Sequence, residues 1–280
     1  MTIIESILMG IIQGLTEFLP ISSTGHLTVA GKLLNLVSDD KHWTAFIAVI
    51  QLGTLAAVLV YFRKDILNII TEFFKDNLLD KKRFKEQSFN SKLGWMIIAG
   101  TIPVVVIGLA LKDIVEGALT KNLYVISGSL ILLALILAVA EKTAKFKKEI
   151  KDVTMLDALI IGTAQACALI PGSSRSGTTI TGGLFIGLNR ESAARFSFLL
   201  SIPAVFASGL LELYQSLKYL NDAGLIVLII ATLFSAISGY AAIDFLLKYL
   251  RKNSTFVFIY YRIALGILIL ALLWSGVIQP

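Results

Sequence analysis

Two short polar segments interrupt the long apolar stretches of this 280-residue chain. The first, QGLTEFLPISSTGH at 13–26, brings Glu17, Ser23 and His26 close together in sequence. Ser23 is a candidate nucleophile, and His26 could take its proton or protonate a leaving group. Gln13 lies four residues before Glu17, so both side chains would share one face of a helix. We expect this pair to hold a divalent cation, or Glu17 to act as the general base.

The second segment, PGSSRSGTT at 171–179, surrounds Arg175 with hydroxyl side chains and glycines. An arginine at membrane depth costs on the order of a few kcal/mol, so it requires an anionic partner. A guanidinium binds phosphate through two parallel hydrogen bonds, and N–H groups at a helix start bind anions. Pairing with a buried carboxylate, or capping of a helix, is the alternative. The candidate substrate-binding residues are Ser22, Thr24, Gln51, Ser173, Ser174, Ser176 and Thr178.

The composition is that of a membrane protein, because 56% of the residues are hydrophobic and only 16% are charged. Soluble domains carry about 25% charged residues. Long apolar runs recur, each able to cross a hydrocarbon core of about 30 Å. A bias of Lys and Arg to cytoplasmic loops explains the net charge of +6, and no basic helix or aromatic platform predicts nucleic-acid binding. The sequence therefore predicts an all-α polytopic membrane protein.

The elements that carry the polar segments are broken helices. Apolar runs on either side of each segment are too short to span alone, so 1–37 and 158–188 are predicted to be re-entrant helix–loop–helix pieces. Charged loops are predicted at 63–92, with an amphipathic surface helix, and at 141–157. The six predicted spans are 43–62, 93–111, 122–140, 196–214, 223–243 and 256–278.

Basic residues orient these elements in the membrane. Segments 63–92, 141–157, 189–195 and 244–255 hold 18 Lys and Arg, against 4 at 38–42, 112–121 and 215–222. The basic side should be cytoplasmic, which leaves both termini outside.

The chain also contains an internal repeat within one membrane domain, 1–280. Its halves, 1–140 and 158–280, are related by an offset of about 152 residues, which aligns Gln13 with Gln165. Three spans per half give inverted topology, which predicts that the two re-entrant tips meet near the midplane.

Both motifs together resemble the undecaprenyl pyrophosphate phosphatase family, also called bacitracin-resistance proteins, over essentially the whole chain. The resemblance implies a bacterial cytoplasmic-membrane enzyme that converts the C55 isoprenyl pyrophosphate to the monophosphate for peptidoglycan synthesis. It also implies a divalent cation, Mg²⁺ or Ca²⁺, and a site open to the outer face. The family motifs fall on Gln13, Glu17, Ser23, His26 and Arg175, and they leave open whether Ser23 or His26 is the nucleophile.

A second class of function remains open from the sequence alone. Inverted repeats with broken helices are also a transporter architecture, so the polar tips could bind a polyprenyl phosphate lipid that the protein only carries or flips. The expected partners are this polyprenyl pyrophosphate lipid and the surrounding membrane lipids. A second copy of the chain, in a homodimer, is a further candidate.

Overall fold

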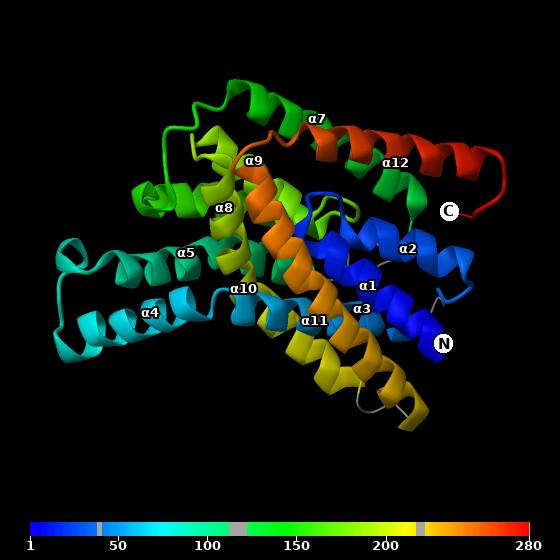
Figure 1. Ribbon diagram of the computed structural model, residues 1–280, viewed down its shortest axis with the longest axis horizontal. Helices are drawn as coiled ribbons and strands as arrows, with labels where there is room; N and C mark the ends of the chain where they lie inside the picture. The colour runs from blue at the N-terminus through cyan, green and yellow to red at the C-terminus, as the bar shows by residue number, and fades with distance from the viewer. Residues whose placement is uncertain (38–40, 112–121, 217–221, 280) are drawn as a thin grey trace.

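The computed structural model describes residues 1–37, 41–111, 122–216 and 222–279, and the described chain is helical (Figure 1). Five helices are long and apolar enough to cross a membrane: α5 (Phe89–Ala110), α7 (Leu123–Thr143), α10 (Arg190–Ser216), α11 (Asp222–Leu250) and α12 (Phe256–Trp274). A sixth is obtained if α3 (Lys41–Tyr61) and α4 (Arg63–Phe74) count as one bent span. The predicted multi-pass helical architecture is therefore confirmed, while most residues of the three predicted outer loops lie outside the described residues.

Both predicted helix–loop–helix pieces are present as pairs of short helices. α1 (Ile3–Phe18) ends just before Pro20, and α2 (Ser23–Leu33) begins after the break. α8 (Met155–Ala166) continues into a 3-10 turn, Cys167–Leu169, and α9 (Arg175–Phe185) begins after a second break. Proline lacks the N–H that a helix interior needs, and Gly172 takes a left-handed φ of 84°. These residues explain why neither helix runs on.

The two helix pairs begin with the same cap. Thr2 accepts a hydrogen bond from the Glu5 N–H while the Glu5 carboxylate accepts one from the Thr2 N–H. Thr154 and Asp157 repeat both bonds at the start of α8. Each capping box satisfies N–H groups that a helix start would leave unpaired. The cap residues are separated by the same offset as the two polar sequence motifs.

The second helix of each pair also begins in the same way. Ser22 and Ser174 have left-handed φ angles of 75° and 68°, and each accepts a 3.2 Å hydrogen bond from a glycine N–H three residues later. Such a conformation costs a non-glycine residue about 1–3 kcal/mol, and it is concentrated at functional sites. Both breaks are therefore held in a strained backbone geometry.

The amphipathic helix predicted within 63–92 is present as α4, and it packs against a neighbouring helix. α3 turns by 77° at Phe62 into α4, which a short π-helix, Lys75–Leu79, extends. α4 then packs against α5, and the pair projects from the rest of the molecule on the left of Figure 1. The Asp76 carboxylate, which accepts from Lys82 Nζ and from the Ser88 N–H, closes this hairpin.

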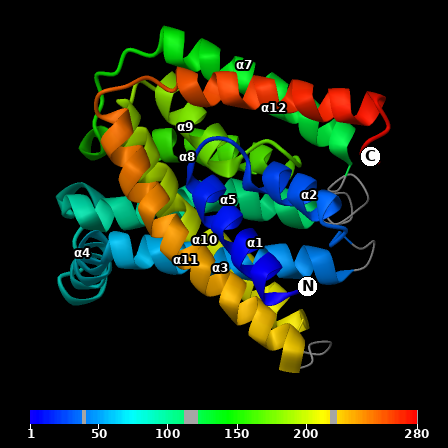
Figure 2. The same ribbon diagram turned by 45° about the vertical axis from the view of Figure 1, so that its right-hand side comes forward.

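Close contacts between helices fix the breaks in the interior. α1 packs on α11, where a Cβ on Gly10 would meet the carbonyl of Ala231. α8 packs on α5, where a Cβ on Gly162 would meet the carbonyl of Gly100. Small residues allow such backbone contact between membrane helices. α7 and α12 lie side by side in Figures 1 and 2, and both termini lie at the end of the molecule away from the α4–α5 hairpin.

Candidate active site

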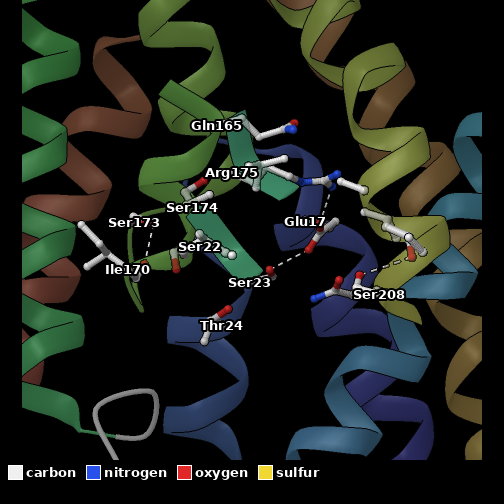
Figure 3. Close-up of a pocket in the computed structure, with 18 of the residues that line it drawn as sticks. Glu17, Ser22, Ser23, Thr24, Gln165, Ile170, Ser173, Ser174, Arg175 and Ser208 are labelled. Carbon is white, nitrogen blue, oxygen red and sulfur yellow. Dashed lines mark hydrogen bonds and ion pairs between the residues drawn. The ribbon is translucent and has the colours of Figure 1, made fainter. Parts of the chain in front are cut away.

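A cavity of about 410 Å³ lies where the two helix breaks meet (Figure 3). Most of the predicted site residues line it. These are Glu17, Ser22, Ser23, Thr24, Gln51, Ser173, Ser174 and Arg175. The first four come from the first break, Gln51 from α3, and the last three from the second break. The structure therefore brings together segments that lie in opposite halves of the sequence.

Glu17 is the centre of the polar wall. Its side chain is only 5% exposed, and its Oε1 atom lies 2.5 Å from Nη2 of Arg175. Its Oε2 atom accepts hydrogen bonds from Ser23 Oγ at 2.7 Å and from Gln13 Nε2 at 2.9 Å. Figure 3 shows the carboxylate pointing between Ser23 and Arg175. A buried carboxylate is stable when it is paired and hydrogen-bonded in this way.

Ser23 and Glu17 have the geometry of a nucleophile and its base. The 2.7 Å hydrogen bond from Ser23 Oγ to Glu17 Oε2 lies inside the range that such pairs need. Ser23 is the first residue of α2, so its side chain stands at a helix N-terminus. An anion that bound there would meet the positive end of the helix dipole.

Arg175 pairs with Glu17 and still has an unused donor. Its Nη2 atom is taken by Glu17, whereas its buried Nη1 atom has no hydrogen-bond partner. The alternative that the sequence left open, a buried carboxylate partner, is therefore present. It does not exclude phosphate binding, because the guanidinium carries five N–H donors and only one side of it is occupied.

The hydroxyl groups after Arg175 have different surroundings from those predicted. Ser176 Oγ donates a 3.0 Å hydrogen bond to the Leu19 carbonyl, which joins the second break to the first. Thr178 Oγ1 donates to the Arg175 carbonyl within α9. Neither residue lines the cavity, whereas Ser173 and Ser174 do. Ser176 thus joins the two breaks, whereas the Thr178 hydroxyl bonds only within α9.

His26 points away from Ser23. Its Nδ1 atom lies 2.7 Å from the Ser22 carbonyl, and its Nε2 atom lies 2.7 Å from the hydroxyl of Tyr261 on α12. A carbonyl can only accept, so Nδ1 carries a proton and the neutral ring accepts from Tyr261. The imidazole stacks on the Tyr261 ring and does not line the cavity. The structure therefore places His26 as a support of the Ser22 backbone.

Two buried glutamines carry amide atoms that have no hydrogen-bond partner. Gln165 is fully buried and lines the cavity, and neither its Nε2 nor its Oε1 has a hydrogen-bond partner. Gln13, its counterpart in the first helix pair, has a free Oε1. An unpaired buried amide costs about 1–3 kcal/mol, which a polar ligand in the cavity would recover.

The predicted cation ligands are Glu17 and Gln13 on α1. No group of three or more His, Cys, Asp or Glu side chains able to hold a metal occurs in the described part of the chain. Glu17 and the free Oε1 of Gln13 provide oxygen atoms on adjacent turns of α1. Mg²⁺ is commonly held by one or two protein groups together with substrate phosphates and water. Of this pair only Glu17 lines the cavity, so the residues fit a cation that takes most of its ligands from a bound phosphate and water.

The rest of the cavity wall is mainly apolar, with Ser208 of α10 as a polar exception (Figure 3). Its residues come from α5, α10 and the turn after α8: Val104, Val105, Leu109, Leu169, Ile170, Ala204, Val205, Ala207 and Leu211. Pro103 and Pro203 lie inside α5 and α10, directly before these lining residues. A site with one charged wall and one apolar wall suits a molecule that has an anionic head and a hydrocarbon tail.

Sequence comparisons identify the family of this chain. A family model described as bacitracin resistance protein BacA matches residues 6–268. The chain belongs to the BacA family. A protein of Syntrophobacter fumaroxidans named undecaprenyl-diphosphatase is 58% identical over 276 residues, which cover 98% of this chain and 97% of its own. Proteins of the same name from Chloroherpeton thalassium and Myxococcus xanthus are 53% and 49% identical, across all of this chain and 99% and 92% of theirs.

Residues outside the two motifs also support the site of this BacA family member. Tyr261 holds His26, and the fully buried Arg262 donates from Nη2 to the Ser173 carbonyl at 2.9 Å. From its position early in the last apolar run, Arg262 could equally lie at the membrane interface or face the site. The sequence signal for a role of Arg262 in the site was its position as a charged residue inside an apolar span. Gln165 appeared only as the repeat counterpart of Gln13, and no sequence signal identified the apolar wall.

Proposed function

We propose that this chain is a membrane undecaprenyl-diphosphatase, which removes one phosphate from undecaprenyl pyrophosphate and releases undecaprenyl phosphate. The reaction recycles the lipid carrier for peptidoglycan synthesis and confers bacitracin resistance. The observation that carries the proposal is the position of Glu17, which contacts Ser23 and Arg175 at once on the cavity wall. Membership of the BacA family and the name of the relatives support the same activity.

In the proposed mechanism, Ser23 Oγ attacks the terminal phosphorus while Glu17 takes its proton. The bond from that phosphorus to the bridging oxygen breaks, and undecaprenyl phosphate leaves with the electron pair. Water then attacks the phosphoserine, releases inorganic phosphate and restores Ser23. In the variant of this mechanism without a covalent intermediate, Ser23 and Glu17 orient the attacking water.

Arg175 and the second break hold the pyrophosphate. Arg175 lines the cavity and would bind a phosphate through N–H groups that Glu17 leaves free, while Nη2 keeps Glu17 in place. Neutral hydrogen-bond donors to the phosphate come from three serines and from the N–H groups that begin α2 and α9. The serines are Ser22, Ser173 and Ser174. Fixed donors of this kind stabilise the charge that moves in phosphoryl transfer, and they need no reorganisation during the reaction.

His26, Ser176 and Thr178 belong to the proposal as positioning residues. His26 fixes the Ser22 carbonyl, and thereby the backbone that presents Ser23. Ser176 joins the two breaks through the Leu19 carbonyl. A direct role of His26 in proton transfer would require its ring to leave both of its present partners.

A divalent cation, Mg²⁺ or Ca²⁺, is proposed to enter with the pyrophosphate. Glu17 and Gln13 would be its protein ligands. When bound, the ion would neutralise charge on the phosphate oxygens. Gln13 supplies no charge, so we expect the affinity for the cation to depend mainly on the pyrophosphate.

The proposed membrane arrangement is an inverted repeat in the bacterial cytoplasmic membrane. Matching caps, matching helix bounds and the parallel glycine contacts of α1 and α8 support a repeat. The end with the termini would face outward, with the site open to that side, and the basic α4–α5 hairpin would face the cytoplasm. A homodimer stays a prediction that a mass measurement in detergent would test.

The decisive experiment is phosphate release from C55 isoprenyl pyrophosphate by the purified chain in detergent. We expect turnover that is lost in Glu17→Ala and Arg175→Ala. A protein that moves the lipid between leaflets of sealed vesicles and releases no phosphate would instead be the transporter that the sequence left open. The name of the relatives supports hydrolysis and gives that alternative no support.

A further inference from the structure

Arg262 is a buried cation without a buried anion. It lies in the first half of α12, its exposure is 0%, and it is the largest side chain among the fully buried ones described. No described carboxylate forms an ion pair with it, although Glu141, Glu17 and Asp157 are each paired with another cation. An uncompensated charge in the interior is costly, so a compensating group is expected close by.

The hydrogen-bond partners of Arg262 show where an anion that neutralises its charge would lie. Its Nη2 atom donates to the Ser173 carbonyl at 2.9 Å and lies 3.5 Å from the Ser129 carbonyl. Its Nε and Nη1 atoms are buried and have no hydrogen-bond partner. Ser173 lines the cavity, so the guanidinium lies directly behind the loop that would receive the pyrophosphate.

Gly177 shows how closely Arg262 approaches the start of α9. A Cβ at Gly177 would lie 2.6 Å from Nη1 of Arg262, so any side chain there would displace the guanidinium. Gly25 is the equivalent position in α2, and its N–H makes the same bond to a serine cap. A Cβ on Gly25 would meet its nearest neighbours at an ordinary 3.4 Å. The second break alone therefore has a cation packed against its first turn.

We propose that Arg262 is a positioning residue for the reaction: it fixes residues 171–174 through the Ser173 carbonyl and supplies a buried positive charge behind the first turn of α9. The inference rests on the proposed function, because the pyrophosphate is the anion that offsets this charge. The guanidinium acts through the backbone of the loop and through its field, since it does not line the cavity.

The roles of Arg262 and Arg175 are thereby distinct. Arg175 reaches the cavity directly and is neutralised by Glu17. Arg262 contributes a net charge that no carboxylate in the described part of the chain cancels, so it should determine affinity for the pyrophosphate head. Tyr261, the preceding residue of α12, holds the first break through His26. Consecutive residues of one helix thus reach both breaks.

The test uses the full-length protein in detergent and the variants Arg262→Met, Arg262→Lys, Gly177→Ala and Gly25→Ala. The KM and kcat for C55 isoprenyl pyrophosphate are measured together with inhibition by inorganic pyrophosphate, which probes the head site without a tail. We expect Arg262→Met to raise both KM and the inhibition constant at least about 10-fold, as loss of a charged hydrogen bond does. Arg262→Lys, which keeps the charge, should lie between it and the wild type.

Gly177→Ala keeps Arg262 in the sequence and moves its side chain, so it tests the contact even if Arg262→Met does not fold. It should raise KM and the inhibition constant as Arg262→Met does, and by more than Gly25→Ala, which adds the same Cβ at the equivalent position of α2 without meeting a cation. Wild-type KM and inhibition constants in Arg262→Lys and Gly177→Ala, with only the unfolding temperature lowered, would overturn the proposal. If the wild type released no phosphate, the proposed function itself would fail.

Discussion

Ser23 Oγ and Glu17 Oε2 lie 2.7 Å apart on opposite sides of the first helix break. Glu17 ends the buried face of α1, whereas Ser23 begins α2, and the chain between them turns at Pro20. The same carboxylate binds Arg175 from the other half of the chain. The proposed base, nucleophile and phosphate-binding arginine are thus joined through one side chain, and its replacement should affect all three.

Glu17→Gln should lower kcat by about 10²–10⁴-fold, the usual loss when a general base is removed. Glutamine keeps the shape of the side chain but cannot take the Ser23 proton or neutralise Arg175. Phosphate release is measured beside Glu86→Gln, which changes an exposed carboxylate on the α4–α5 hairpin. Equal rates for the two variants would refute the assignment of the base.

His26→Asn distinguishes positioning from proton transfer. The asparagine N–H₂ can replace Nδ1 as donor to the Ser22 carbonyl, but it cannot titrate. If His26 only fixes the backbone, the variant should keep kcat within about 10-fold of the wild type, the scale of one altered hydrogen bond. His26→Ala, which loses the bond, should be slower than His26→Asn. Equal and complete loss in both variants would favour a direct role for the imidazole.

Gln165→Leu should raise KM about 10-fold or more while kcat changes less, because a lost hydrogen bond to a charged phosphate weakens binding. Gln165→Glu should raise KM further, since a carboxylate would repel the pyrophosphate. Both constants come from phosphate release at varied lipid concentration. Wild-type KM in both variants would show that the free amide of Gln165 meets no substrate.

Chelation of divalent cations should lower phosphate release, and added Mg²⁺ should restore it. Gln13→Glu should reduce the Mg²⁺ concentration for half-maximal rate, because a second carboxylate is placed beside Glu17. Without cations the two like charges should lower the unfolding temperature of this variant, and Mg²⁺ should raise it again. An unfolding temperature that is insensitive to Mg²⁺ would argue against cation binding at these residues.

Asp157 provides a pH-dependent element at the start of α8, outside the spans. Burial raises the pKa of its carboxyl, but hydrogen bonds from Thr154 and Lys148 outweigh burial and hold the pKa below its ordinary value. Folding lowers this pKa, so the stabilisation is complete above about pH 4, the pKa in an unfolded chain, and disappears as the pH falls through the lower folded value.

Asp157→Asn should therefore lower the unfolding temperature at pH 7 by about 2–4 °C, the shift that corresponds to about 1 kcal/mol in a chain of this size. The difference from the wild type should shrink as the pH is lowered below about 4. Thermal unfolding in detergent across this pH range measures both effects. A difference that does not change with pH would assign the loss to the cap geometry alone.

The spans and the helix breaks could be predicted from local sequence. Apolar runs of sufficient length identified α5, α7, α10, α11 and α12, and the prolines and polar motifs identified the two breaks. The end of the first span at 62 and the amphipathic helix after it could also be predicted. The 77° turn of α3 into α4, and the packing of α4 on α5, could not be, because they depend on contacts in the folded hairpin.

By itself, the sequence determined the helical membrane class, the two polar motifs, the family and most of the polar cavity residues. Only the tertiary structure decided that Glu17 pairs with Arg175, that His26 turns to Tyr261 and that Arg262 lies behind the second break. The physical reason is that the sequence signals, which are apolar periodicity and helix breaks, report only on residues close together in the chain. In a chain whose helices are apolar on every side, only close packing between helices sets which face of each one points to the site.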